Sequence, residues 1–147
     1  MGRSATAIPS LEEIKCKPLS EASCQEIQLE LIRRRRFNAF DGERVAATLW
    51  AHRDLWEAVM MDRVAISNPG HLPALGMRKL RDLPHDDWNV DTLHILTRNR
   101  ANADRLAKLF RPRDWGGMVD VHADHDDVDS ALGGALPKQS VVSIWWD

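Results

Sequence analysis

The stretch "DTLHILTRNRANADRLAKLF", residues 91–110, decides the expected fold, because a strand pattern passes directly into a helix pattern. Residues 91–97 form a short apolar run that is typical of a strand, and residues 99–110 place Leu106, Leu109 and Phe110 on one face of a helix. Two more strand patterns follow, "GGMVDVHA" at 116–123 and "QSVVSIWWD" at 139–147. Between them, "DHDDVDSAL" predicts a short helix that ends at the glycine pair 133–134.

This order of strand, helix, strand, helix and strand is typical of a parallel sheet with right-handed crossovers. We therefore expect an α/β fold, with N-terminal helices packed on a small, three-stranded, mostly parallel sheet. The length of 147 residues suits a single domain, 1–147. Its expected parts are a helical part at 1–63, a long irregular connection at 64–90 and a βαβαβ part at 91–147.

The N-terminal third carries start signals for three helices. Ser10 with Glu13 forms a capping box, and Ser20 is placed to cap a second helix that runs to about Arg36. Asp41 is a good N-cap for a third helix. In that third helix one apolar stripe follows the helical period and includes a histidine that we expect to be a hydrogen-bonded core residue. The stripe consists of Val45, Leu49, His52, Trp56 and Val59.

Residues 64–90 contain three prolines and two glycines in a stretch too long for an ordinary connector. A helical turn with basic side chains is expected from Met77 to Leu83. Such a segment is either a binding loop or a plain wrapping of the core.

Several classes of protein are disfavoured by what the chain lacks. No apolar run approaches the roughly 18 residues that a spanning helix needs, and the N-terminus has no apolar leader. Cys16 and Cys24 form no CxxC motif, so reduced thiols are expected. We therefore expect a cytoplasmic protein that does not associate with a membrane. There is also no nucleophile elbow, Walker-type loop or GxGxxG fingerprint.

Charge is unevenly distributed along the chain. Residues 64–113 carry nine basic and five acidic side chains, whereas residues 114–147 carry one basic and seven acidic side chains. The two segments either neutralise each other in the fold or present oppositely charged patches to partners.

The run Arg33, Arg34, Arg35 and Arg36 lies at the end of the predicted second helix. Successive helical residues are about 100° apart, so four of them cannot face one phosphate backbone. A solvated helix end that complements the helix dipole explains the run. The alternative is binding of nucleic acid or an acidic partner, together with Arg78, Lys79 and Arg81, which requires one continuous basic face.

The strongest candidate for chemistry lies after the second predicted strand, at "HADHDD", 122–127. A parallel sheet would bring this segment to one rim with Arg98 and the C-terminal residue Asp147. His122, Asp124, His125 and Asp126 could then hold Mg²⁺ or Mn²⁺ in a phosphoryl or nucleotide hydrolase, with Arg98 neutralising phosphate charge. The alternative is that Asp124 or Asp126 caps the following helix and that no ion is bound.

Trp145 and Trp146 are adjacent on the last predicted strand, so they point to opposite faces. We expect one to enter the core and the other to contact a helix or a partner. Short sheets also leave edges that another chain can pair with. The function we favour is therefore a non-catalytic adaptor or regulatory module that binds another protein or a second copy of itself and needs no cofactor. The metal-dependent hydrolase and a nucleic-acid-binding accessory protein remain as alternatives.

Overall fold

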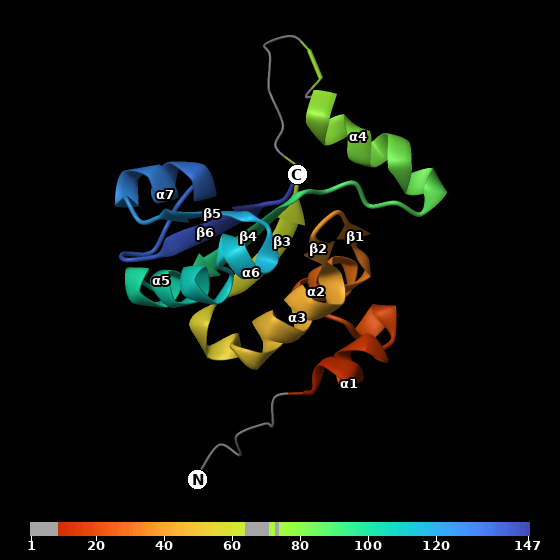
Figure 1. Cartoon of the computed structure of the whole chain (residues 1–147), viewed down its shortest axis with the longest axis horizontal. Helices are drawn as coiled ribbons and strands as arrows, with labels where there is room; N and C mark the ends of the chain where they lie inside the picture. The colour runs from red at the N-terminus through yellow and green to blue at the C-terminus, as the bar shows by residue number, and fades with distance from the viewer. Residues whose placement is uncertain (1–8, 64–70, 73) are drawn as a thin grey trace.

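The computed structural model describes residues 9–63, 71–72 and 74–147 (Figure 1). The fold is mixed α/β, as expected, but its sheets are antiparallel. Part of the predicted irregular connection, residues 64–70 and 73, lies outside the described residues. No helix in the described ranges has the length and hydropathy needed to cross a membrane.

The first two helices begin at capping boxes. Helix α1, Leu11–Lys15, starts at Ser10 and Glu13 as predicted. Helix α2, Cys24–Arg34, starts at Ser23, whose side chain accepts the Glu26 N–H while the Glu26 carboxylate accepts the Ser23 N–H. The prediction of Ser20 as the cap was wrong. Residues Leu19–Glu21 form a separate 3-10 turn, and Ser23 has the glutamate three residues later that completes a capping box.

A two-stranded hairpin joins α2 to helix α3, Gly42–Ala51. Its strands are β1, Arg36–Phe37, and β2, Phe40–Asp41. Asp41 caps α3, as predicted, by accepting the Arg44 N–H. A Cβ at Gly42 would lie 2.1 Å from the Ile32 carbonyl oxygen, so only glycine allows α3 to start this close to the end of α2.

The prediction that α3 continues to Val59 was wrong. The helix ends at Ala51, a 3-10 turn follows at Arg53–Leu55, and Val59 lies in strand β3, Ala58–Asp62. Trp56 is buried beyond the helix, where its indole N–H donates to the Leu49 carbonyl at 2.7 Å. Apolar residues in the turn and the strand therefore continued the helical spacing by coincidence. His52 is half-buried and hydrogen-bonded to the Thr48 carbonyl at 2.9 Å, as expected of a core histidine.

The main sheet contains four strands in the order β3-β4-β6-β5, and every neighbouring pair is antiparallel. The later strands are β4, Thr92–Thr97, β5, Met118–His122, and β6, Ser140–Trp145. The prediction of a three-stranded, mostly parallel sheet was wrong. Strands β4 and β5 do run the same way, joined by helix α5, Arg100–Leu109, but β6 lies between them and runs the opposite way.

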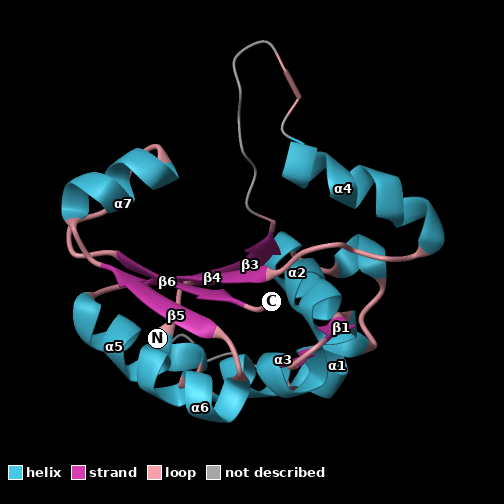
Figure 2. Ribbon diagram, turned by 45° about the horizontal axis from the view of Figure 1, so that its top comes forward, coloured by secondary structure: helices cyan, strands magenta, loops and turns pink. Residues whose placement is uncertain are grey.

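Helices lie on both sides of this sheet, and they cover its two faces unequally (Figure 2). Helices α2, α3 and α5, with the short α6, Pro112–Trp115, cover the inner face. The core lies there, with Leu93, Ile95, Val142 and Ile144 fully buried. Of the helices that the structure describes, only α7, His125–Leu132, and α4, Ala74–Asp82, lie on the outer side, with a 3-10 turn at Leu83–His85 after α4.

Candidate functional site

The predicted metal ligands are divided between a strand end and a helix start. Asp124 is the N-cap of α7, and its Oδ1 accepts the Asp127 N–H at 3.0 Å. His125 and Asp126 lie exposed in the first turn of that helix, and His122 ends β5. Among the described residues, no group of three His, Cys, Asp or Glu side chains is placed to hold a metal ion.

The antiparallel arrangement also separates the groups that were expected at one rim. Strands β4 and β5 run the same way, so their C-terminal ends, which Arg98 and Asp124 follow, lie at the same end of the sheet. Strand β6, however, lies between the two strands. Arg98 is exposed, and its Nε lies 3.7 Å from Glu57 Oε1. Because β6 runs the other way, its C-terminal end and Asp147 lie at the opposite end of the sheet from Arg98 and Asp124. The prediction that the C-terminal residue joins the cluster was therefore wrong.

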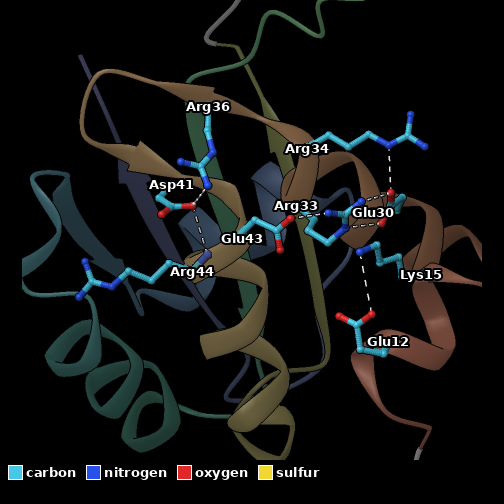
Figure 3. Close-up of polar contacts among 9 residues, drawn as sticks. All are labelled: Glu12, Lys15, Glu30, Arg33, Arg34, Arg36, Asp41, Glu43 and Arg44. Carbon is cyan, nitrogen blue, oxygen red and sulfur yellow. Dashed lines mark hydrogen bonds and ion pairs between the residues drawn. The ribbon is translucent and has the colours of Figure 1, made fainter.

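Each of the four consecutive arginines contacts at least one carboxylate, and Figure 3 draws three of the four. Arg33 lies between Glu30 and Glu43, with nitrogen–oxygen distances of 2.6 and 2.5 Å, and its hydrogen bond lowers the pKa of Glu30. Each of the next three arginines also has a carboxylate neighbour. These pairs are Arg34 with Glu30, Arg35 with Asp87 and Arg36 with Asp41. In Figure 3 the side chains of Arg34 and Arg36 extend in different directions, so they do not form one surface for an anion.

The basic residues of α4 lie on the outer side of the sheet, away from the body of α2 (Figure 2). Lys79 contacts the carboxylate of Asp62, and Arg81 contacts Asp82 with a closest distance of 2.5 Å. Arg78 is exposed. The carboxylates beside Lys79 and Arg81 reduce the positive potential that a nucleic-acid backbone would meet.

The outer face of the sheet carries the polar residues that the sequence reasoning missed. Cross-strand pairing places Met60, His94, Ser143 and Asp120 in one row across all four strands. His94 Nδ1 lies 2.9 Å from Ser143 Oγ, and both side chains are half-buried. The period-two alternation in "TLHILT" was the available signal. It puts His94 on the face opposite to Leu93 and Ile95.

Helix α7 closes one side of this face and creates a groove. The groove has a volume of about 460 Å³ and lies between α7 and the sheet. Its apolar walls include Met60 and Leu132, which remain 46% and 44% exposed, and the buried Val128. His94, His122 and Ser143 provide polar groups at the sheet, and Asp127 lies at the start of α7. The groove is therefore an accessible apolar surface with a few polar groups.

The environment of His94 favours its neutral form. Burial lowers its pKa, the nearby His122 acts in the same direction, and Asp62 and Asp91 oppose the shift. Asp62 contacts Lys79 and accepts the Arg63 N–H at 2.7 Å instead of binding the imidazole. Within the described ranges no carboxylate hydrogen-bonds to His94. The serine–histidine contact thus lacks the third group that orients the base in a catalytic triad.

The two tryptophans occupy different environments, as predicted. Trp146 is 1% exposed, and its indole N–H donates to the Trp115 carbonyl at 2.9 Å. Trp145 is 39% exposed at the end of β6 and shares the outer face with Met60 and Met118.

Comparison with protein-family models, with curated protein sequences and with solved structures finds no match for this chain.

Proposed function

We propose that this chain is a cytoplasmic, non-catalytic adaptor or regulatory module that binds another protein over the outer face of its four-stranded sheet. The observation that carries the proposal is the groove beneath α7. It combines exposed apolar side chains with few polar groups. Exposed apolar grooves of this kind occur at protein-binding and ligand-binding sites.

The exposed side chains belong to neighbouring rows of one surface. Met60 lies in the row of His94, while Trp145 and Met118 are paired in the next row on the same face. Their exposed fractions are 46%, 39% and 61%. Because the core on the inner face is already buried, these residues are not needed to complete it. A partner that covers them gains hydrophobic burial energy.

Charge around the groove indicates the chemistry of the partner. The groove residue Asp127 and four neighbours in β5 and α7 have no ion-pair partner among the described residues; the neighbours are Asp120, Asp124, Asp126 and Asp129. The expectation that the basic middle segment neutralises this acidic one is met by one ion pair among the described residues, Arg111 with Asp114. We therefore propose a partner segment with apolar side chains and an excess of Lys and Arg.

The two alternative functions receive less support from the geometry. The proposed metal ligands are spread over a strand end and a capped helix start, with Asp124 committed to the cap. The basic residues contact separate carboxylates on two sides of the sheet. The groove, by contrast, is already formed in the structure.

Site-specific photo-crosslinking tests the proposal. A photoreactive phenylalanine analogue is introduced at Met60, or at the exposed Leu19 as a matched control far from the groove. In a native lysate we expect a discrete crosslinked product from position 60 and not from position 19. Leu132→Lys, which places a positive charge in the groove wall against a basic partner, should abolish that product. Equal crosslinking from both positions, or crosslinking unaffected by Leu132→Lys, would contradict the proposal.

A further inference from the structure

The two edges of the main sheet differ in how their backbone groups are satisfied. At edge strand β3, the Gln25 side chain accepts the Val59 N–H at 2.9 Å and donates to the Val59 carbonyl at 2.8 Å. Helix α2, which carries Gln25, also packs against this strand. A side chain thus occupies the position that a further strand would take. This edge is closed to pairing with another chain.

Strand β5 forms the other edge, and no described residue protects it in a comparable way. It pairs with β6 on one side. Within the described ranges no hydrogen bond reaches its backbone from the other side. Figure 2 shows β5 at the front of the sheet, with α5 and α6 below it and no element alongside. Its outward backbone groups are therefore available to an added strand.

We infer that β5 receives an extended segment of the partner as a fifth strand of the sheet. The inference rests on the proposed function and specifies how the partner is bound. Main-chain hydrogen bonds to an open edge supply affinity, and alternate side chains supply specificity. Here the added strand would continue the outer face that carries the groove.

The side chains of β5 define the segment that fits. Val119 and Val121 are half-buried on the inner face, so the neighbouring residues of the partner should be apolar. Asp120 is exposed on the outer face at the centre of β5, between Met118 and His122. A Lys or Arg opposite Asp120 completes an opposite-charge cross-strand pair.

A second copy of this chain fits the edge less well. Antiparallel pairing of two β5 strands around a twofold axis through their centres would set Asp120 directly against Asp120 of the other copy. Like charges placed directly opposite each other destabilise strand pairing. The structure therefore favours a basic, alternating strand from a different protein.

Two short peptides serve as probes. In one, valine alternates with lysine between terminal threonines, and in the other glutamate replaces lysine. We expect the lysine peptide to bind about fivefold more tightly, the ratio to which ~1 kcal/mol for one cross-strand pair converts. It should also slow hydrogen exchange at the β5 amides. Asp120→Lys, which changes an exposed side chain, should reverse the preference. Asp126→Lys makes an equal charge change on α7, and with this variant the lysine peptide should still bind more tightly than the glutamate peptide.

Several results would overturn the inference. One is absence of lysine-peptide binding, and another is binding that leaves β5 exchange unaltered. A third is an equal affinity for a lysine peptide with N-methylated backbone amides, because that peptide cannot form the backbone hydrogen bonds of strand pairing. Concentration-dependent protection of β5 without peptide, with a dimer mass by light scattering, would instead indicate self-association. If position 60 still crosslinks while the peptide fails, the groove proposal stands and the strand inference falls.

Discussion

At the scale of single residues, His94 shows how one polar side chain marks a surface. It sits on a central strand between two buried apolar residues, where the alternation sends it to the outer face. Hydrogen bonding to Ser143 at 2.9 Å satisfies one ring nitrogen, and burial holds its pKa below the usual range. A half-buried histidine of this kind makes folding sensitive to pH.

We expect the stability of the protein to fall as pH drops below about 6.5, the value for an unperturbed histidine. The native pKa of His94 lies below that of the unfolded chain, so the unfolded state takes up a proton that the native state does not. His94→Gln removes this proton uptake. The loss of melting temperature between pH 7.5 and pH 5.5 should therefore be smaller in the variant.

Thermal unfolding by circular dichroism at the two pH values checks this expectation. His85→Gln is the matched control, because it removes an exposed imidazole in the turn after α4. If wild type and His94→Gln lost the same number of degrees on acidification, protonation of His94 would not be coupled to folding.

At the scale of elements, α7 explains why the acidic stretch is where it is. Strands β5 and β6 are antiparallel neighbours, so the segment that connects them starts and finishes at the same end of the sheet. Helix α7 forms within this connecting segment and lies over the outer face of the sheet (Figure 2). Asp124 accepts the free N–H of Asp127, and the carboxylates of Asp126 and Asp127 lie in the first turn, where they complement the positive end of the helix dipole. Their first role is therefore structural.

Substitution of Asp124 separates capping from metal binding. Asp124→Ala should cost about 1 kcal/mol of stability, because the hydrogen bond to the Asp127 N–H is lost. Asp124→Asn should cost little, since asparagine is an equally good N-cap. Urea unfolding of both variants, with and without Mn²⁺, measures these changes.

The control for this experiment is Asp126→Ala, which removes an exposed first-turn carboxylate that is not the cap. Its expected cost is only a few tenths of a kcal/mol. A result in which Asn destabilises as much as Ala, or in which Mn²⁺ stabilises wild type but neither variant, would favour a ligand role for the Asp124 carboxylate.

At the scale of the whole molecule, the unequal cover of the sheet predicts a gradient of local stability. Strands β4 and β6 are central, and the fully buried core residues Leu93, Ile95, Val142 and Ile144 lie on them. Helix α4 lies outside the core, with Met77 and Leu80 exposed. Regions with few buried contacts open at low free-energy cost.

Native-state hydrogen exchange should reveal this gradient. Amides of β4 and β6 should exchange at least about a hundredfold more slowly than amides of α4, because the former require global unfolding and the latter only local opening. Mass spectrometry of peptides covering the two regions measures the ratio. Equal protection of α4 would show that it is packed far more tightly than its exposure indicates.

The sequence by itself determined most of the local structure. The capping box at Ser10, the Asp41 cap, a cap at either Asp124 or Asp126, the helix after β4 and the three C-terminal strands follow from side-chain period and from hydrogen bonds within a few residues. These interactions depend on neighbours in the chain, so a single sequence displays them. The burial of one of the two adjacent tryptophans and the exposure of the other likewise follow from strand alternation, whereas the structure decided that Trp146 is the buried one.

Only the tertiary structure decided how the strands pair. Local pattern gives no strand direction, and the insertion of β6 between β4 and β5 depends on packing between distant segments. The sequence pattern did not predict strand β3, because Trp56 and Val59 continued a helical spacing. In the structure Val59 pairs with Ile95 of the neighbouring strand. The groove beneath α7 and the contrast between a closed β3 edge and an open β5 edge arise from the same long-range pairing. Both features depend on contacts between residues far apart in the chain, which local sequence patterns do not specify.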